Sequence, residues 1–515
     1  MTERFDAIVV GAGHNGLVCA TMLARAGKSV VVLEANEVVG GGAGSHEFAP
    51  GFRVSSCAHL LYQLPRDLRR KLGLDVPVVA DDLATIALSD SGAHLRISGG
   101  SVLGASAADR DAYQHLHRQL DRFAALLAQQ FKKAPPRIGS GRRRDALALA
   151  RLAFDLRRLG RADMSEFLRL ISMNVHDELV ERFESPLLRG ALALEAVLGQ
   201  RAGPRSPGTL AALLHRRAGG GVYQQPAGGM GAVSDRLAGL AQEAGADIRL
   251  GTPVATVAVD NGRVVGVETA SGDRLESYTV VSSASPQRTV LDLVGAPHFE
   301  PGFVRRVRNI RGTGSAAKLH LALSRLPAAE GLGPDDLGQR LVIADDENYV
   351  ERAFNPAKYR QYSEQPVVEF TVPSLADASL APAGKHVLSA VVQYAPADLD
   401  GGWTDGARNH FEAAVLDVLE TRLPGLRGAI EASELLVAPD LEARFGLSAG
   451  HWHHAELALD QFMFVRPVPG ATRYALPLDG LFLCGAGAHP GGGVSGLPGM
   501  NAAGVILQRD KSRWQ

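Results

Sequence analysis

One stretch near the start of the chain decides the fold: FDAIVVGAGHNGLVCATMLARAGKSVVVLEANEVVGGGAGS, residues 5–45. Residues Ala7–Val10 form an apolar, β-branched run, and residues from His14 to Ala26 follow a helical periodicity. A second apolar run covers Ser29–Leu33. Uninterrupted apolar runs of this length are typical of strands buried on both faces of a parallel sheet. The stretch therefore predicts a strand, a helix and a second, parallel strand.

Three glycines stand at the first turn of this unit in the order G-x-G-x-x-G. In a dinucleotide-binding unit, Gly11 permits the tight turn, Gly13 lets the backbone approach a pyrophosphate, and Gly16 lets the helix pack closely on the strand. The phosphates lie at the helix N-terminus, where free N–H groups favour negative charge. Glu34 ends the second strand, close to the roughly 20-residue spacing expected of a carboxylate that binds the ribose. Such a carboxylate disfavours the 2′-phosphate of NADP.

A second glycine cluster, Gly40–Gly42, follows the glutamate and would let the chain pass close to the far side of the same pyrophosphate. The pattern Glu34-x5-Gly40-Gly41 resembles the extended fingerprint of two-dinucleotide-binding-domain flavoproteins, a group that contains amine oxidases and carotenoid desaturases. The resemblance implies FAD as the cofactor, held in part by Gly41 and Gly42. Many relatives carry an arginine after the paired glycines. Here Gly42 and Ala43 stand instead, which removes a side-chain contact and leaves the backbone cradle intact.

The C-terminal segment LFLCGAGAHPGGGVSGLPGMNAAGVIL, residues 481–507, is also rich in glycine. It begins as an apolar strand and ends as a helix of small residues that starts near Leu497–Asn501. Glycines at this density are tolerated where a ligand or another backbone comes very close. The helix N-terminus would point free N–H groups at electron-rich flavin atoms. The segment closely resembles the flavin-binding signature of the phytoene-desaturase-like family. That resemblance implies cofactor contacts from Gly485, Gly496 and Met500.

Further segments extend the resemblance over nearly the whole chain. Residues 226–272 resemble the middle segment of the same family, in which Val254 holds the position that contacts the adenine. Residues 372–396 and 451–467 look like one branch of the carotenoid/retinoid oxidoreductases, the branch called pyridine nucleotide-disulfide oxidoreductase domain-containing proteins. No second complete G-x-G-x-x-G lies in a strand–turn–helix context. We therefore expect no separate NAD(P)H domain, and oxygen or a quinone as the electron acceptor.

The expected fold class is α/β: a Rossmann-type FAD-binding domain with an α+β substrate domain. A chain of 515 residues is long enough for two domains. The stretch from Leu147 to Leu214 is helical in character, whereas residues 315–323 and 385–394 alternate as strands do. The motifs predict a discontinuous FAD domain over 1–80, 222–300 and 470–515, and a substrate or cap domain over 81–221 and 301–469.

Composition narrows the function classes. The chain is 46% hydrophobic and 21% charged with a net charge of -1, typical of a folded protein without a global field that attracts nucleic acid. Cys19, Cys57 and Cys484 show no C-x-x-C spacing, which indicates neither a disulfide framework nor a redox dithiol. No secretory signal and no apolar run of about 20 residues is present. We expect a cytoplasmic protein with a hydrophobic small-molecule substrate and no nucleic-acid partner.

A basic run lies between Phe131 and Ala162, where ten lysines and arginines oppose only Asp145 and Asp155. On a helix from about residue 145, leucines share one face and charged residues share another. Two interpretations stay open. Residues 137–161 contact a membrane surface through which a hydrophobic substrate enters, or they form an ordinary solvated helix.

Three residues are candidates for the chemistry. Lys318, in GSAAK, resembles the lysine of flavin amine oxidases that holds a water near flavin N5; the alternative is a solvated lysine at a strand edge. His489 lies in the glycine-rich loop, and His454 matches a family position before the LDQ…RP segment. Either histidine, if it titrates near neutral pH, acts as a base or orients the flavin; the alternative is a structural histidine. The spacing of His451, His453, His454 and Glu456 fits no zinc signature, so no metal is expected.

These features predict an FAD-dependent oxidoreductase that desaturates or dehydrogenates C–C bonds of a hydrophobic substrate, polyisoprenoid or acyl. Two alternatives stay open. One is an isomerase of a polyene that uses reduced FAD without net oxidation, and the other is a flavoprotein with a regulatory or scaffold role.

Overall fold

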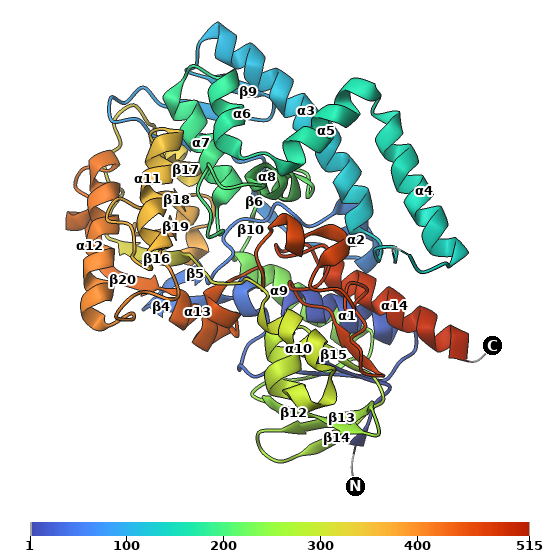
Figure 1. Ribbon diagram of the computed structural model, residues 1–515. Helices are drawn as coiled ribbons and strands as arrows, with labels where there is room; N and C mark the ends of the chain where they lie inside the picture. Colours follow the sequence, from blue (N-terminus) through green and yellow to red (C-terminus); the bar gives the residue numbers. More distant parts are fainter. Residues whose placement is uncertain (1–2, 138, 514–515) are drawn as a thin grey trace.

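The computed structural model describes residues 3–137 and 139–513, and a five-stranded parallel sheet lies in its lower half (Figure 1). The strand order is β11–β3–β2–β15–β21, and all neighbouring pairs run parallel. The strands are β2 (Ala7–Val10), β3 (Val30–Leu33), β11 (Asp247–Arg249), β15 (Val280–Ser282) and β21 (Leu481–Leu483). All but β11 are completely buried, which explains their continuous apolar sequences. The predicted α/β unit is confirmed, with α1 (His14–Arg25) between β2 and β3.

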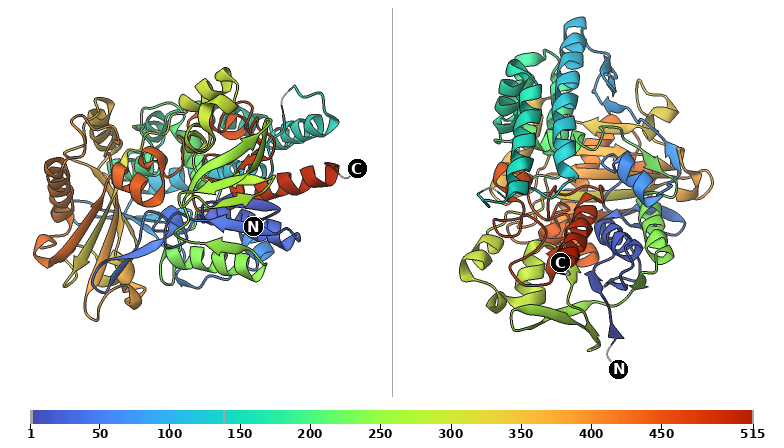
Figure 2. Two further views of the ribbon diagram at one scale, coloured as in Figure 1. Left: turned by 90° about the horizontal axis from the view of Figure 1, so that it is seen from below. Right: turned by 90° about the vertical axis from the view of Figure 1, so that its right-hand side faces the viewer.

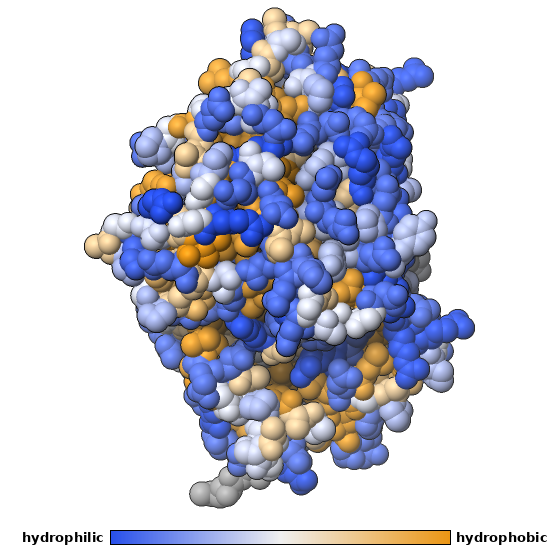
Figure 3. Space-filling view, turned by 90° about the vertical axis from the view of Figure 1, so that its left-hand side faces the viewer, coloured by the Kyte–Doolittle hydropathy of each residue, from blue (hydrophilic) through white to orange (hydrophobic). Residues whose placement is uncertain are grey.

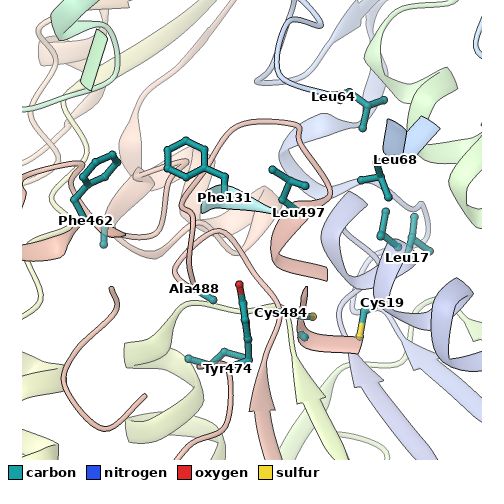
Figure 4. Packing of buried hydrophobic residues seen from close by; sticks show 14 of the residues in the cluster. Leu17, Cys19, Leu64, Leu68, Phe131, Phe462, Tyr474, Cys484, Ala488 and Leu497 are labelled. Atoms are coloured by element: carbon teal, nitrogen blue, oxygen red, sulfur yellow. The ribbon is translucent and has the colours of Figure 1, made fainter. Parts of the chain in front are cut away.

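Three helices lie side by side against this sheet (Figure 2). They are α9 (Met230–Glu243), α1 and α14 (Leu497–Arg513), with α1 in the middle. Glycine allows the backbones of α1 and α14 to touch, because a Cβ on Gly499 would lie 2.0 Å from the carbonyl oxygen of Asn15. Figure 4 shows the apolar cluster at this crossing, which includes Leu17, Cys19, Leu68, Cys484 and Leu497. The two ends of the chain are thereby packed into one core.

A four-stranded sheet covers the bottom of the molecule in Figure 1. Its order is β1–β14–β13–β12, and the strands are β1 (Glu3–Arg4), β12 (Val254–Asp260), β13 (Arg263–Thr269) and β14 (Arg274–Glu276). The helix α10 (Pro301–Arg308) lies near it. Val254, predicted as an adenine contact, is the first residue of β12.

An eight-stranded mixed sheet forms the second large layer, in the order β20–β16–β19–β18–β17–β7–β8–β9. Only the pair β17–β7 runs parallel. The strands are β7 (Thr85–Ala87), β8 (Leu95–Ser98), β9 (Ser101–Leu103), β16 (Ala316–Leu323), β17 (Arg340–Ile343), β18 (Val367–Thr371), β19 (His386–Gln393) and β20 (Ile430–Leu436). The two alternating segments predicted as strands are β16 and β19, neighbours in this sheet.

One face of this sheet packs on α12 (Asp405–Arg422), whose buried residues Phe411, Val415 and Leu419 meet leucines of β16 in a second apolar cluster. Figure 3 shows the side of the molecule that carries this layer, on which hydrophilic side chains predominate. The opposite face of the sheet is turned toward the parallel sheet. The space between the two sheets holds the candidate site described below.

Helices above the sheets confirm the helical character predicted between Leu147 and Leu214. They are α3 (Ala107–Phe131), α4 (Arg143–Arg158), α5 (Arg161–Ser172), α6 (Val175–Arg182), α7 (Pro186–Val197) and α8 (Thr209–Arg217). The helix α4 stands apart from the body at the right of Figure 1. None of the helices within the described ranges is long and apolar enough to cross a membrane.

The remaining α-helices are α2 (Arg66–Leu72), α11 (Glu347–Lys358) and α13 (Ala438–Phe445). The remaining strands form two two-stranded sheets, of β4 (Ser45–Ala49) with β5 (Phe52–Ser55) and of β6 (Val78–Ala80) with β10 (Gln225–Pro226). All five strands of the parallel sheet fall within 1–80, 222–300 and 470–515, and all eight strands of the mixed sheet fall within 81–221 and 301–469. The division into two domains at these boundaries stays a prediction.

Candidate functional site

A cavity of about 510 Å³ lies between the parallel sheet and the mixed sheet. Its wall combines the glycine turns that follow β2 and β3, the segment from Cys57 to Gln63, the strands β18 and β19, and the loop from Trp452 to His454. A cavity of this size is within the usual range of about 300–1,000 Å³ for small-molecule and cofactor sites. Segments from the two ends and the middle of the chain therefore meet at one site.

The first glycine turn has the geometry that its motif predicts. Gly11 has φ +95°, a conformation that L side chains rarely adopt, and a Cβ on Gly16 would lie 2.2 Å from the carbonyl oxygen of Gly11. Gly13 is different, because a Cβ there would meet no atom within 4 Å although the residue lines the cavity. The turn thus leaves open space directly at the N-terminus of α1, where unpaired N–H groups attract phosphate.

The second glycine cluster lies beside the first. The backbone N–H of Gly40 donates a hydrogen bond to the carbonyl oxygen of Ala12 at 2.9 Å. Gly41 and Gly42 both line the cavity, and a Cβ on Gly41 would again meet no atom within 4 Å. Two glycine-lined segments therefore border the same open space, which explains why one short stretch of sequence contains both.

Glu34 closes the cavity at the end of β3, where its side chain is nearly buried. One carboxylate oxygen accepts a hydrogen bond from the N–H of Ala12 at 2.6 Å, and the other accepts one from the N–H of Asn36 at 3.0 Å. Each oxygen keeps a further lone pair for a ligand hydroxyl. Val254 lines the same end of the cavity. So do residues 442–447, which belong to α13 and the turn after it; the sequence did not indicate that these residues line a site.

The C-terminal glycines serve mainly the packing of one chain segment on another. A Cβ on Gly485 would lie 2.1 Å from the carbonyl oxygen of Ser283, and a Cβ on Gly496 would lie 3.0 Å from the side chain of Leu68. Gly493 does line the cavity. The wall of the cavity does not include Gly485, Gly496 or Met500 among the described residues, and their assignment to the cofactor stays a prediction.

Lys318 lies in the middle of β16 and has no exposed surface. It is therefore not the solvated strand-edge lysine that was the alternative. Its Nζ donates hydrogen bonds to Nδ1 of His59 at 3.3 Å and to Oγ of Ser389 at 3.0 Å. Burial lowers the pKa of Lys318 to about 8. Cys57 and His59 line the cavity, and Lys318 lies behind them.

His59 connects Lys318 to Glu369, because its Nε2 donates a hydrogen bond to Oε1 of Glu369 at 3.1 Å. Burial, with the nearby Lys318 cation as a lesser cause, lowers the pKa of His59 to about 4. The imidazole is thus neutral at neutral pH, protonated on Nε2 and accepting on Nδ1. Oε2 of Glu369 in turn accepts hydrogen bonds from Nε and Nη2 of Arg340 at 2.9 and 2.5 Å. The sequence did not lead us to expect this network, although the single glutamate inside the apolar strand VVEFT is a signal for it.

His454 and His489 occupy different environments. His454 lines the cavity, and its Nδ1 is buried without a hydrogen-bond partner among the described residues. His489 is not part of the cavity wall; its ring nitrogens face the carbonyl oxygens of Met463 and Gln130 at 3.3 and 3.2 Å. Burial lowers the pKa of each to about 4. Burial thus keeps both imidazoles neutral at neutral pH, so the condition under which either was to act as a base near neutral pH is not met. Their catalytic roles stay predictions.

The cavity fits FAD on two independent observations. Glycines leave its phosphate end open, and four polar side-chain atoms on its wall have no hydrogen-bond partner among the described residues. These atoms are Oδ1 of Asn15, Oε1 of Gln63 and Nδ1 of His453 and His454. Buried polar atoms without partners are uncommon unless a ligand or water completes them. Within residues 3–137 and 139–513, no group of three or more His, Cys, Asp or Glu side chains is arranged to hold a metal ion.

Comparison with known proteins agrees with this geometry. A family model described as flavin containing amine oxidoreductase matches residues 16–506. Pyridine nucleotide-disulfide oxidoreductase domain-containing protein 2 of Mus musculus is 34% identical, over 99% of this chain and 94% of that protein. Phytoene desaturase (lycopene-forming) of a Paracoccus species is 24% identical, over 96% of this chain and 95% of that protein.

Solved structures show the same fold. Cyclohexylamine oxidase from Brevibacterium oxydans has a TM-score of 0.56 to this chain at 17% sequence identity, over 98% of this chain and 99% of that one.

Proposed function

Because the chain belongs to the family of flavin-containing amine oxidoreductases, with FAD as its cofactor, we propose that it dehydrogenates a C–C bond of a hydrophobic substrate. The observation that carries this proposal is the charge on the side of the cavity formed by the mixed sheet and α8. Arg216, Arg340 and Lys318 are the cations around this wall, and they exceed the anions Glu369 and Glu195 by one charge. A protonated amine is repelled by such a wall. A neutral or anionic substrate is not.

The uncharged part of the same wall is apolar. Leu60, Leu198, Val391 and Trp452 line the cavity beside the histidines that burial keeps neutral. An apolar substrate that fills this space displaces water from it, and exclusion of water strengthens the electrostatic interactions inside. The wall therefore suits a substrate whose reacting carbons carry no charge.

Removal of two hydrogens from a C–C bond releases one hydride equivalent and one proton. FAD, when bound, accepts the hydride equivalent. We assign the proton to Nζ of Lys318 in the molecules in which this amine is neutral, a fraction that is small at pH 7 and increases as pH approaches its pKa of about 8. His59 fixes the position of Nζ, and Ser389 provides its second partner. Oxygen or a quinone then reoxidises the flavin in this proposal, since the sequence contains no second dinucleotide motif.

Anaerobic mixing of the FAD-loaded protein with two classes of substrate tests the proposal. Phytoene and decanoate represent apolar carbon chains, and putrescine and cyclohexylamine represent amines. We expect loss of the visible absorbance of oxidised flavin with an apolar chain, a product lighter by two hydrogens, and no change with the amines. Reduction by the amines alone would overturn the proposal. A product of unchanged mass without net reduction would instead favour the isomerase.

We also propose that α4 contacts a membrane surface, as the basic run suggested. Leu147 and Phe154 are 52% and 60% exposed, and five arginines of this helix, Arg143, Arg144, Arg151, Arg157 and Arg158, are exposed with them. Exposed apolar and basic side chains on one helix suit an anionic lipid surface.

Flotation with phosphatidylserine-containing liposomes tests this contact. The variant Leu147→Glu/Phe154→Glu should lose most of the binding of the wild-type protein. The matched variant Leu103→Glu/Val180→Glu, which changes equally exposed residues on β9 and α6, should keep it. Equal flotation of all three proteins, or none by the wild type, would contradict the contact.

A further inference from the structure

The side chain of Arg216 is held in a fixed position on the cavity wall. Arg216 lies near the end of α8, its side chain is 12% exposed, and it lines the cavity together with Tyr62 and Gln63. The guanidinium carbon lies 4.5 Å from the ring centre of Tyr62 and 5.6 Å from that of Tyr223. Its Nε donates a hydrogen bond to the hydroxyl of Tyr223 at 3.1 Å. Two aromatic rings and one hydrogen bond therefore orient the guanidinium plane.

The two terminal nitrogens of Arg216 make no hydrogen bond with any residue in the described ranges. Nη2 lies 3.7 Å from Oε2 of Glu369, too far for a hydrogen bond. That carboxylate is already occupied, because its Oε2 accepts from Arg340 and its Oε1 accepts from His59. The terminal nitrogens thus remain as donors on a wall that also lines the substrate space.

The charges around Arg216 leave an excess of positive charge. The cations of the network are Arg216, Arg340 and Lys318. The anions are Glu369 and Glu195, the latter of which accepts a hydrogen bond from the hydroxyl of Tyr223 at 3.3 Å. Arg217, the next residue, is paired with Asp121 at 2.9 Å and does not line the cavity. Among the described residues, three cations therefore face two anions, and Arg216 shares Glu369, at 3.7 Å, with Arg340.

We propose that Arg216 is a carboxylate-binding subsite and that the substrate is an apolar molecule with a terminal carboxylate. This inference rests on the proposed function and names its substrate class. The planar guanidinium presents two N–H donors to a carboxylate in a bidentate arrangement. Leu60, Leu198 and Val391 line the cavity for the apolar body of the same molecule. Arg216 would bind the carboxylate, and the carbon chain would then lie in the apolar part of the cavity, which the glycine turns also border.

Equilibrium dialysis of the FAD-loaded protein with decanoate and decan-1-ol tests the subsite, because the two probes share a carbon chain and differ in charge. We expect the wild-type protein to bind decanoate at least tenfold more tightly than decan-1-ol at pH 7.5. Arg216→Met should weaken decanoate binding at least tenfold and change decan-1-ol binding less than twofold. Arg216→Lys keeps the charge without the bidentate geometry, so its loss for decanoate should be intermediate.

Arg217→Met is the matched control, since it removes the neighbouring arginine of the same helix and should leave the preference for the acid intact. The FAD absorbance of each variant verifies that the cofactor is retained. Equal binding of acid and alcohol by the wild type, or an unchanged preference in Arg216→Met, would overturn the subsite. The dialysis is carried out anaerobically after reduction of the bound FAD with dithionite, so that the flavin accepts no hydride and binding is measured without turnover. A failure of the proposed dehydrogenation, seen as no reduction of oxidised flavin by any apolar chain, is thereby distinguished from a failure of the subsite.

Discussion

Lys318 and Glu369 stand in one row across three neighbouring strands, with Val391 between them. Lys318 of β16 is opposite Val391 of β19, which is opposite Glu369 of β18. Residues directly opposite in adjacent strands point to the same face of a sheet. His59 then joins the two charged side chains through its two ring nitrogens. The register of the mixed sheet thus fixes both the position and the burial of the only lysine predicted to take part in the chemistry.

The pH dependence of stability should reveal the buried lysine. The pKa of Lys318 is about 8 in the folded protein against an ordinary value of 10.5. Between these two values the unfolded chain binds more protons at this residue, so the folded protein gains stability as pH rises. Relative to Lys318→Met, the free energy of unfolding of the wild type should increase by up to roughly 3 kcal/mol from pH 8 to 10.5. Thermal denaturation across this pH range measures the difference. Lys385→Met, which removes an exposed pair with Glu431, is the control and should show no such trend.

Gly13→Ala should release FAD without unfolding the protein. Gly13 has φ -66°, which alanine adopts without strain, and the added Cβ projects into the open phosphate end of the cavity. We expect the FAD dissociation constant to rise at least tenfold, measured by flavin fluorescence on dilution, with an unchanged melting temperature of the cofactor-free protein. Gly504→Ala in α14 meets no neighbour and lies outside the cavity, so it should retain FAD as the wild type does. Full retention by Gly13→Ala would show that the pyrophosphate lies elsewhere.

Gly499→Ala should destabilise the contact between the two ends of the chain. The new Cβ would overlap the carbonyl oxygen of Asn15, and overpacking of this kind costs about 1–3 kcal/mol. Denaturant titration should therefore show a lower unfolding midpoint. The substitution Gly504→Ala, five residues along the same helix, should stabilise slightly because alanine is the better helix former. Equal midpoints for both variants would mean that α1 and α14 do not touch as described.

Arg340→Met should be strongly destabilising, because it leaves the buried carboxylate of Glu369 without its principal partner. Both side chains are almost fully buried, at 1% and 2% exposure. Removal of one member of a buried pair costs about 3–5 kcal/mol. The double variant Arg340→Met/Glu369→Gln should recover part of this loss. Arg274→Met, from an exposed pair with Glu268, should change the free energy of unfolding by less than about 0.5 kcal/mol. A loss in the double variant equal to that in Arg340→Met would contradict the ion pair.

The structure also separates two kinds of glycine that look alike in the sequence. Gly13 and Gly41 border open space, whereas Gly16, Gly485 and Gly499 touch another part of the backbone. The motif predicts close approach at all of them. Whether the approaching group is a ligand or a chain segment depends on the neighbours, and these come from distant parts of the sequence.

The sequence by itself determined the strand–helix–strand unit at residues 7–33, the adjoining glutamate and glycines, and the FAD cofactor. These features are local: strand and helix periodicities, and a turn that admits only small residues, are set by neighbouring residues along the chain. The tertiary structure alone decided that Lys318 is buried and that Arg216 faces the cavity. It also decided that His59 contacts the amino group of Lys318, although the two residues lie 259 positions apart in the sequence. Those contacts depend on the order and register of strands joined across long connections, and on burial, which changes the pKa of a side chain without leaving any mark in the local sequence.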